Sequence, residues 1–525
     1  MKKHFDYIFI GSGIGAQLAA SLLARFKKKK ILIVEKHFTA GGFTHTFKRK
    51  NKFFWDVGIH YIGDLQPGSI LRKLFDLMSD GKLMWQKMPE VFEKFVYPDQ
   101  TFSVRDTPEN YKADLVKTFP QEADALSKYF DDIRKVNAWF GRHISIRGKA
   151  PFTDAIDDAY RAKEHYSPTQ STKAYLDFRF SDDRLKSILT SQWGNYGLPP
   201  EKSAFLIHCA VVQHYLNGGY YPLGGSHKII ESIEPFITAA HGEIWTSHEV
   251  QEILIENGIA TGIRVKPLRG GDQSPFEVSA DNIISNTGAF NTYQKLIPAS
   301  VPISFRRELE AFYSQHPVVS NVTLYLGLNR DPRELGFSGE NHWIYSTYDH
   351  DANFKNGLDW IEKGKPVGAY LSFPSLKNAE ATAHTAEIIA FTDYRFFERW
   401  KTQPWKKRDE AYKQLKEQIS DNLIAFIEQQ YPGFSAMIEF RELSTPITNE
   451  YFSSHPRGSI YGVACVPERF NRALAGFCDP VSPIKNLYLT GADVSSPGVA
   501  GAMMGAVATL AQLEDGFTLM DLMRL

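Results

Sequence analysis

A glycine-rich turn near the start of the chain has the residue types and spacing that bind a dinucleotide. The run Gly11-Ser12-Gly13-Ile14-Gly15-Ala16 lies between an apolar run and a helix-forming run. Gly11 permits a sharp turn, Gly13 lets a pyrophosphate approach the backbone, and Ala16 lets helix and strand pack closely. The N–H groups at the start of the helix would then face the phosphates.

An acidic residue follows at the distance that ribose recognition requires. Glu35 ends a second apolar run, residues 31–34, about 20 residues after the turn, where a carboxylate accepts hydrogen bonds from ribose hydroxyls. The nearly apolar stretch 8–26 has the alternative interpretation of a membrane anchor. The clustered glycines and the β-rich run before them argue against an anchor.

Two further glycine patterns indicate more than a nicotinamide site. Gly41 and Gly42 follow Glu35 closely and form a second backbone nest for phosphate or ribityl oxygens. Near the end of the chain, Gly491 and Asp493 follow an expected strand and precede a helix of small residues. The Asp493 carboxylate is placed to bond ribityl hydroxyls, and the helix start can stabilise an anionic reduced flavin. The plain alternative for this stretch is a buried helix of small residues.

The bulk composition excludes several classes of protein. The chain has 525 residues with 60 basic and 60 acidic side chains, so its formal charge is zero and a nucleic-acid partner is not expected. Three cysteines fit a reducing compartment and form neither a disulfide framework nor a metal motif. No P-loop, HExxH or Ser-His-Asp pattern is present. We expect a cytoplasmic location with no metal, and the oligomeric state stays open.

Seven stretches, in order, resemble one family of flavoenzymes. GSGIGA, EKHFTAGGFTHTF and WDVGIHYIG look like the phytoene desaturase, carotenoid isomerase and retinol saturase superfamily of FAD enzymes that act on polyene lipids. Three later stretches, GGYYPLGGSHKI (218–229), ISNTGAFNTYQKLIP (284–298) and FPSLKNAE (373–380), look most like its retinol saturase branch, and LYLTGADVSSPGVAGAMMGA (487–506) also matches.

The resemblance implies a fold and a division of the chain. We expect an α/β protein with a Rossmann-like FAD-binding domain, discontinuous in sequence, plus an α+β substrate domain with an antiparallel sheet and a helical insertion. The expected FAD-binding domain comprises residues 1–70, 206–295 and 476–525. Residues 71–205, rich in helical spacing, form the expected helical insertion or lid, and residues 296–475 the substrate-binding domain.

The resemblance also implies the residues of the site. The expected FAD contacts are Gly11, Ser12, Gly13, Ile14, Gly15, Ala16, Glu35, Lys36, Gly41, Gly42, Phe43, Gly58, Ile59, His60, Val250, Asn286, Gly491, Asp493, Gly501, Ala502 and Met503. A saturase needs a hydride from the flavin and a proton for the second carbon, so a general acid must reach the substrate. The candidate donors are Tyr221 as first choice, then Tyr220, His60, Tyr61 and Tyr461.

The predicted function is reduction of one C=C bond in a retinol-like or carotenoid-like polyene. Desaturation and cis-trans isomerisation share the same motifs and stay open, and NAD(P)H or a quinone is the expected transient electron partner. A lipid-binding escort of the same fold, without catalysis, is the alternative from another class. Residues 139–147 mix aromatic, aliphatic and basic side chains, which suits either peripheral membrane contact or ordinary helix packing.

Overall fold

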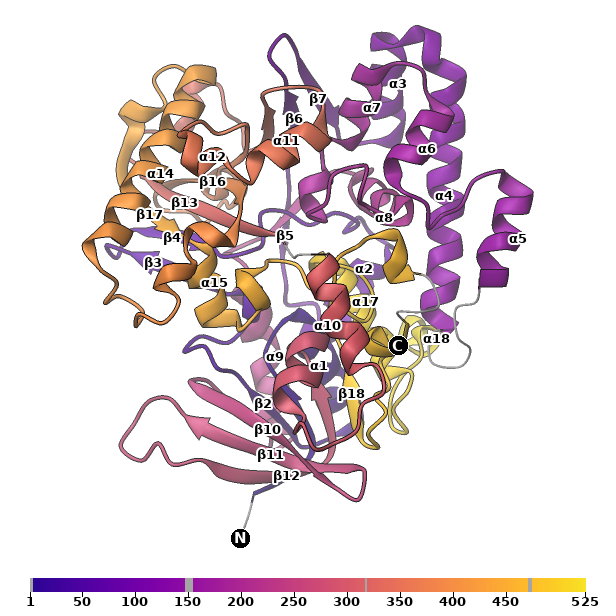
Figure 1. Ribbon diagram of the computed structural model, residues 1–525, viewed down its shortest axis with the longest axis vertical. Helices are drawn as coiled ribbons and strands as arrows, with labels where there is room; N and C mark the ends of the chain where they lie inside the picture. Colours follow the sequence, from indigo (N-terminus) through magenta and orange to yellow (C-terminus); the bar gives the residue numbers. More distant parts are fainter. Residues whose placement is uncertain (1–2, 147–153, 317–318, 471–474) are drawn as a thin grey trace.

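The computed structural model describes residues 3–146, 154–316, 319–470 and 475–525. Its larger sheets are two seven-stranded ones. The first lies in the lower half of Figure 1 with the N-terminus below it, the second lies in the upper half, and purple helices stand at the upper right.

The first sheet is built around the predicted strand, glycine turn, helix and strand. Every residue of β2 and the last four residues of β1 are buried. Strands that are buried on both faces are continuous apolar runs, which explains why these two lack alternation. The strand order is β10-β11-β12-β1-β2-β9, with β18 beside β12. The bounds are β1 (His4–Ile10), α1 (Ile14–Lys27), β2 (Ile31–Val34), β9 (Glu243–Trp245), β10 (His248–Glu256), β11 (Ile259–Pro267), β12 (Phe276–Ser285) and β18 (Leu487–Leu489).

Four of these strands bring their following loops to one edge. β1, β2, β12 and β18 run parallel to one another, so their carboxyl ends share an edge, where open α/β sheets bind ligands. The stretch 8–26 is divided between β1 and α1. Within the described ranges, no helix is both long and apolar enough to cross a bilayer.

The second sheet has the order β17-β13-β16-β15-β14-β6-β7. Its pairs are antiparallel except for β6 and β14, which are parallel. Apolar residues of α14 (Glu410–Gln430) share a core with β13 and β16, so the helix covers one face of the sheet. The strand bounds are β6 (Val91–Val96), β7 (Thr101–Arg105), β13 (Ser320–Leu328), β14 (Asn341–Tyr345), β15 (Gly368–Ser372), β16 (His384–Thr392) and β17 (Ile438–Ser444). The predicted pairing of a Rossmann-like sheet with an antiparallel sheet is confirmed.

The segment 71–205 is not wholly helical, which corrects one expectation. β6 and β7 come from this segment and extend the second sheet through β14. Phe95 belongs to the core shared with the helices, and the next residue, Val96, to the core beneath α14. The stretch therefore alternates between two cores, and its pairing partner lies far along the chain, beyond the reach of local spacing.

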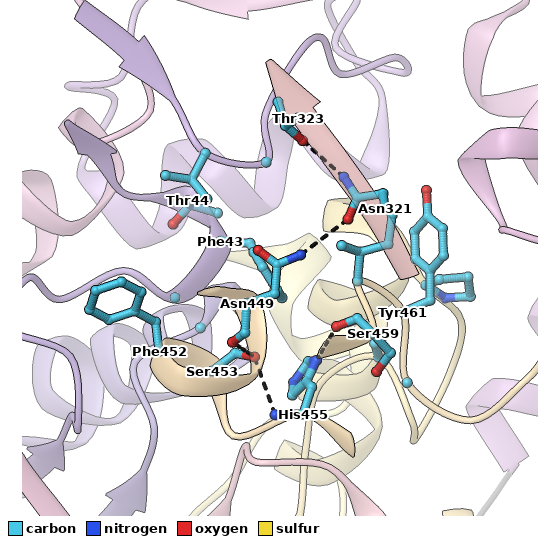
Figure 2. Close-up of a pocket in the computed structure, with 18 of the residues that line it drawn as sticks. Phe43, Thr44, Asn321, Thr323, Asn449, Phe452, Ser453, His455, Ser459 and Tyr461 are labelled. Carbon is cyan, nitrogen blue, oxygen red and sulfur yellow. Dashed lines mark hydrogen bonds between the residues drawn. The ribbon is translucent and has the colours of Figure 1, made fainter. Parts of the chain in front are cut away.

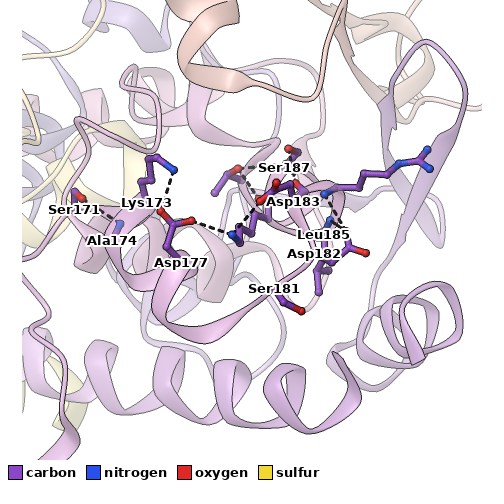
Figure 3. A network of polar contacts seen from close by, with 12 residues as sticks. Ser171, Lys173, Ala174, Asp177, Ser181, Asp182, Asp183, Leu185 and Ser187 are labelled. Atoms are coloured by element: carbon purple, nitrogen blue, oxygen red, sulfur yellow. Dashed lines mark hydrogen bonds and ion pairs between the residues drawn. The ribbon is translucent and has the colours of Figure 1, made fainter. Parts of the chain in front are cut away.

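The helices of this segment are capped and joined by surface charges. Figure 3 shows Asp177 of α6 (Thr172–Arg179) and Asp183 of α7 (Asp183–Thr190). Lys186 Nζ lies 3.0 Å from Asp177 Oδ1, and Lys173 Nζ lies 2.9 Å from Asp177 Oδ2. Asp182 caps α7 by accepting hydrogen bonds from the backbone of Arg184 and Leu185.

The remaining elements complete the molecule. Their bounds are α2 (Ile70–Ser79), α3 (Pro108–Thr118), α4 (Ala123–Ile146), α5 (Asp154–Glu164), α6 (Thr172–Arg179), α7 (Asp183–Thr190), α8 (Phe205–Tyr215), α9 (Lys228–Ala239), α10 (Arg306–Gln315), α11 (His350–Gly357), α12 (Trp360–Lys363), α13 (Pro374–Lys377), α15 (Pro446–Ser453), α16 (Ala475–Cys478), α17 (Gly498–Leu510), α18 (Leu519–Arg524), β3 (Thr46–Arg49), β4 (Phe53–Asp56), β5 (Trp85–Lys87) and β8 (Tyr220–Pro222).

Candidate cofactor and active site

The first glycine turn and the last one are in direct contact. A Cβ atom at Gly15 would lie 2.9 Å from Gly491 Cα and 3.0 Å from the carbonyl oxygen of Ala502. At Gly13 it would lie 2.5 Å from the side-chain nitrogen of Asn286. These spaces exclude any side chain, so the loops after β1, β12 and β18 meet at one point. The two ends of the chain therefore contribute to a single site.

Two helices begin at this point with their first N–H groups uncapped. The N-cap residues are Gly13 for α1 and Pro497 for α17, and neither helix has a side-chain cap or an acidic residue in its first turn. The first four N–H groups of a helix have no partner within it. Because both helix starts line the same cavity, they offer donors and a positive dipole end to an anionic or carbonyl group there.

The Glu35 carboxylate joins the first turn to the strand beside it. Oε2 accepts hydrogen bonds from Ser12 N at 3.0 Å and Ser12 Oγ at 2.6 Å, and Oε1 accepts one from His37 N at 2.7 Å. Burial raises the pKa of Glu35, and these hydrogen bonds oppose that rise. Each carboxylate oxygen has two lone pairs, so Oε1 keeps capacity for a ribose hydroxyl.

The turn at residues 491–493 is held by hydrogen bonds from two neighbouring segments. The carboxylate oxygens of Asp493 accept hydrogen bonds from Val463 N and Ala289 N, each at 2.7 Å. The buried Arg469 guanidinium donates to the carbonyl oxygens of Ala492, Asp493 and Ser495 at 2.9, 3.0 and 3.1 Å. Arg469 was not predicted from the sequence, because it belongs to no motif and acts only across a tertiary contact.

One cavity of about 1370 Å³ joins these loops to the second sheet. Pockets for one drug-sized ligand occupy about 300–1,000 Å³, so this volume suits a dinucleotide together with a second molecule. Beyond the glycine turns, the lining is mostly aromatic and aliphatic. These side chains, here called the aromatic chamber, are Tyr61, Trp193, Ile207, Val211, Tyr215, Trp343, Tyr345, Tyr370, Ile389 and Phe391.

A row of polar side chains, Asn321, Thr323 and Asn449, lies on another wall of the cavity, as Figure 2 shows. Asn321 Nδ2 donates to Thr323 Oγ1 at 2.9 Å, and Asn449 Nδ2 donates to Asn321 Oδ1 at 3.1 Å. Phe43 also lines the cavity, with its ring 5.6 Å from the His455 ring.

The structure brings most of the predicted cofactor residues to the cavity. Those that line it are Gly11, Ser12, Gly13, Ile14, Gly15, Glu35, Lys36, Gly42, Phe43, Gly58, Ile59, His60, Val250, Asn286, Asp493, Gly501 and Ala502. Four others, Ala16, Gly41, Gly491 and Met503, lie behind this lining. Ala16 and Met503 are fully buried and pack α1 and α17 into the core of the first sheet.

Two predicted proton donors lie outside the cavity, which corrects the expectation that they face the substrate. Tyr221 is buried, and its hydroxyl donates to the buried Asp56 carboxylate. Tyr220 pairs its backbone with Ile62, and its ring packs against the core of the first sheet. Successive side chains of their strand, β8, point to opposite faces, and both rings enter packed regions. The residue type and the local spacing do not predict this placement.

The other three candidates line the cavity, and each has a different polar neighbour. The Tyr461 hydroxyl donates to Gly194 O at 2.7 Å. The Tyr61 hydroxyl accepts a hydrogen bond from Asn195 Nδ2 at 3.0 Å. His60 Nδ1 lies 2.7 Å from Glu387 Oε2. Within the described part of the chain, no group of three or more His, Cys, Asp or Glu side chains is arranged to hold a metal ion.

The stretch expected to suit a membrane surface is only partly described. Trp139 is 5% exposed and belongs to the core of α4 and its neighbours, and Phe140 packs against Phe470. Arg147 lies outside the described residues. Both aromatic rings thus contribute to helix packing, which disfavours them as membrane anchors.

A buried carboxyl group behind the aromatic chamber predicts an unusual pH dependence of stability. Glu93 accepts a hydrogen bond from Trp343 Nε1 at 3.1 Å, and burial raises its pKa to about 7. Between pH 4.5, where an unfolded glutamate titrates, and about 7, the unfolded state loses a proton that the folded state keeps. Stability therefore falls as pH rises through this window, by on the order of 3 kcal/mol.

The glutamine in Glu93→Gln cannot ionise. The melting temperature of this variant minus that of the wild type is therefore expected to increase from pH 5 to pH 8 in fluorescence-detected melting. Glu340→Gln is the matched control, since burial raises the pKa of Glu340 but hydrogen bonds from His342 and Lys94 bring it to about 2. That carboxylate loses its stabilising effect only as pH falls below 4.5 towards 2. Parallel melting curves for wild type and Glu93→Gln over pH 5–8 would contradict the prediction.

The fold and the site define the class of protein. A family profile described as NAD(P)-binding Rossmann-like domain matches residues 10–77. A putrescine oxidase variant shares the fold, with a TM-score of 0.63 at 14% identity over 97% of both chains. The protein is an oxidoreductase with a Rossmann-like nucleotide-binding domain.

Sequence relatives define the family. The chain is 32% identical to all-trans-retinol 13,14-reductase of Danio rerio over 523 residues, which are 96% of this chain and 85% of the relative. It is 24% identical to chloroplastic prolycopene isomerase of Daucus carota, over 94% of this chain and 77% of that protein. The chain belongs to the all-trans-retinol 13,14-reductase family.

Proposed function

We propose that the cavity binds FAD. Gly11 to Gly15 and Glu35 would hold the ADP part, and Gly42, Asn286, Asp493 and residues 498–502 the flavin part. The support is physical: two uncapped helix starts meet where glycine contacts leave no room for side chains, and a carboxylate lies beside them. When bound and reduced, the flavin supplies a hydride through N5.

We propose that the enzyme reduces one C=C bond of a conjugated polyene lipid, of retinol-like or carotenoid-like type. The observation that carries this proposal is the continuity of the aromatic chamber with the dinucleotide turns in one cavity. Aromatic and aliphatic walls bind an extended apolar chain and exclude water from it. The all-trans-retinol 13,14-reductases, among the relatives of this chain, lend further support.

His60 is the proposed proton donor for the second carbon. A good general acid has a pKa near the working pH. Burial raises the pKa of Tyr61 well above its usual range, and that of Tyr461 as well, so both phenols are poor donors. His60 lines the same cavity, and a carboxylate oxygen of Glu387 lies 2.7 Å from its Nδ1, which leaves Nε2 to face the substrate.

The test of the function is product identity. Flavin-reduced enzyme is incubated anaerobically with all-trans-retinol and, separately, with a carotenoid, while polyene absorbance and product mass are followed. A gain of two hydrogens with loss of the long-wavelength absorbance is the expected result. An unchanged mass with an altered isomer ratio would instead indicate an isomerase, and loss of two hydrogens a desaturase. No reaction, with bound lipid recovered intact, would favour an escort.

The source of electrons is part of the proposal. The predicted sites contain one dinucleotide turn, so a nicotinamide or quinone would bind transiently in turn with the substrate. Loss of the flavin absorbance near 450 nm on anaerobic addition of NADPH or a quinol would identify the donor.

A further inference from the structure

A lysine buried beneath the site has no directly paired carboxylate among the residues that the structure describes. Lys377, the last residue of α13, is 1% exposed. Its ammonium donates to Asn341 Oδ1 and Ser372 Oγ, each at 2.6 Å, and to the backbone oxygen of His60 at 2.8 Å. A lysine ammonium is strongly hydrated in water, so full burial is costly unless nearby charge offsets it.

The acidic groups nearest this ammonium are two glutamates on strands of the second sheet. Asn341 on β14 is in register with Glu93 on β6, and Ser372 on β15 is in register with Glu387 on β16. The ammonium therefore bridges the two middle strands, with a carboxyl group on the next strand on either side. Both Glu93 and Glu387 are fully buried.

The Glu387 carboxylate lies against the His60 ring. Its Oε2 lies 2.7 Å from His60 Nδ1 as an ion-pair contact that lacks hydrogen-bond geometry, and neither carboxylate oxygen has a hydrogen-bonding partner among the described residues. The His60 side chain is 18% exposed and lines the cavity, whereas Nδ1 itself is buried. Nε2 is thus left as the ring nitrogen available to the cavity.

We propose that Lys377 is a positioning residue whose ammonium offsets the charge of the Glu387 carboxylate in the dry interior, so that Glu387 orients the Nδ1–H of His60 and the mobile proton stays at Nε2. The inference rests on the proposed function, since it assigns the support of the proposed proton donor. Burial of a carboxylate is costly unless a partner or a nearby opposite charge offsets it.

Two other buried carboxyl groups near Lys377 have partners of their own. Asp56 accepts hydrogen bonds from Tyr221 and from Ser226 N, and burial raises its pKa to about 6. Glu340 pairs with Lys94 at 2.7 Å. Lys377 is the remaining ammonium near Glu387, and burial lowers its pKa to about 7, which is the mark of a strongly desolvated cation.

The test compares Lys377→Met with Lys94→Met, which removes the same charge from strand β6 of the second sheet, at a position with no hydrogen bond or ion pair to His60 among the described residues. Histidine is labelled with ¹⁵N, and the His60 signals are identified by their absence in His60→Gln. The wild type and Lys94→Met are expected to show one tautomer of His60, protonated at Nδ1, and Lys377→Met a mixture. We also expect kcat for polyene reduction to fall about 10- to 100-fold in Lys377→Met, with KM within threefold and a wild-type flavin spectrum.

A single Nδ1-protonated tautomer in Lys377→Met, with kcat within twofold of Lys94→Met, would overturn the inference. If Lys377→Met does not fold, Glu387→Leu tests the same link, because its apolar side chain cannot accept the Nδ1–H. Retention of the tautomer in Glu387→Leu would then overturn it. The tautomer measurement needs no substrate, so failure of polyene reduction with an intact tautomer effect would count against the proposed function alone.

Discussion

Gly15→Val is expected to abolish the retention of flavin by the purified protein. The new Cβ would lie 2.9 Å from Gly491 Cα and 3.0 Å from both Gly491 N and the carbonyl oxygen of Ala502. All three are backbone atoms, which cannot swing aside as a side-chain end can. The first and last loops must therefore separate, which moves the starts of α1 and α17 apart and removes the paired donors for the cofactor.

The measurement is the flavin absorbance per protein after gel filtration, with melting temperature as a second readout. Overpacking of this kind costs about 1–3 kcal/mol of folding stability, so the variant is expected to fold while losing flavin. Gly271→Val is the matched control, because nothing lies within 4 Å of a Cβ at that exposed loop position and its φ is not positive. Flavin content in Gly15→Val equal to that of the control would refute the arrangement of the site.

His60→Gln is expected to lower kcat for polyene reduction by about 10²- to 10⁴-fold, the usual contribution of general acid catalysis. Glutamine keeps a polar group of similar reach but does not release a proton at neutral pH. Binding of the polyene to the aromatic chamber does not depend on this proton, so KM is expected to change less than threefold. The measurement is the rate of polyene absorbance loss with flavin-reduced enzyme.

Tyr61→Phe is the comparison that decides between the two adjacent candidates. It removes the hydroxyl that accepts from Asn195 and keeps the ring that stacks on Tyr215 at 4.2 Å. We expect its kcat to stay within about threefold of the wild type, because a phenol whose pKa is raised is a poor donor. A larger loss in Tyr61→Phe than in His60→Gln would transfer the role to Tyr61.

The sequence alone determined the parts of the site that depend on local chain geometry. A turn such as residues 11–16 needs glycines at set positions, a helix start presents N–H groups, and Glu35 follows at the end of the next parallel strand. These constraints act over a few tens of residues, so they appear as spacing. The contact of Gly15 with Gly491 adds a tertiary confirmation that the two ends of the chain share one site.

The tertiary structure alone decided which side chains reach the cavity and which polar groups support them. From the sequence Tyr221 is the first choice and His60 one of four others, yet Tyr221 is bound to Asp56 in the interior and His60 lines the cavity. Lys377 and Glu387 lie ten residues apart in the chain, whereas Glu93 comes from a distant segment and joins them only because β6, β14, β15 and β16 are neighbours. The sequence around a charged strand residue does not identify its partner, because the partner lies on whichever strand pairs beside it. Turn geometry is therefore predictable from the sequence, whereas the electrostatic support of catalysis depends on the register of the sheet.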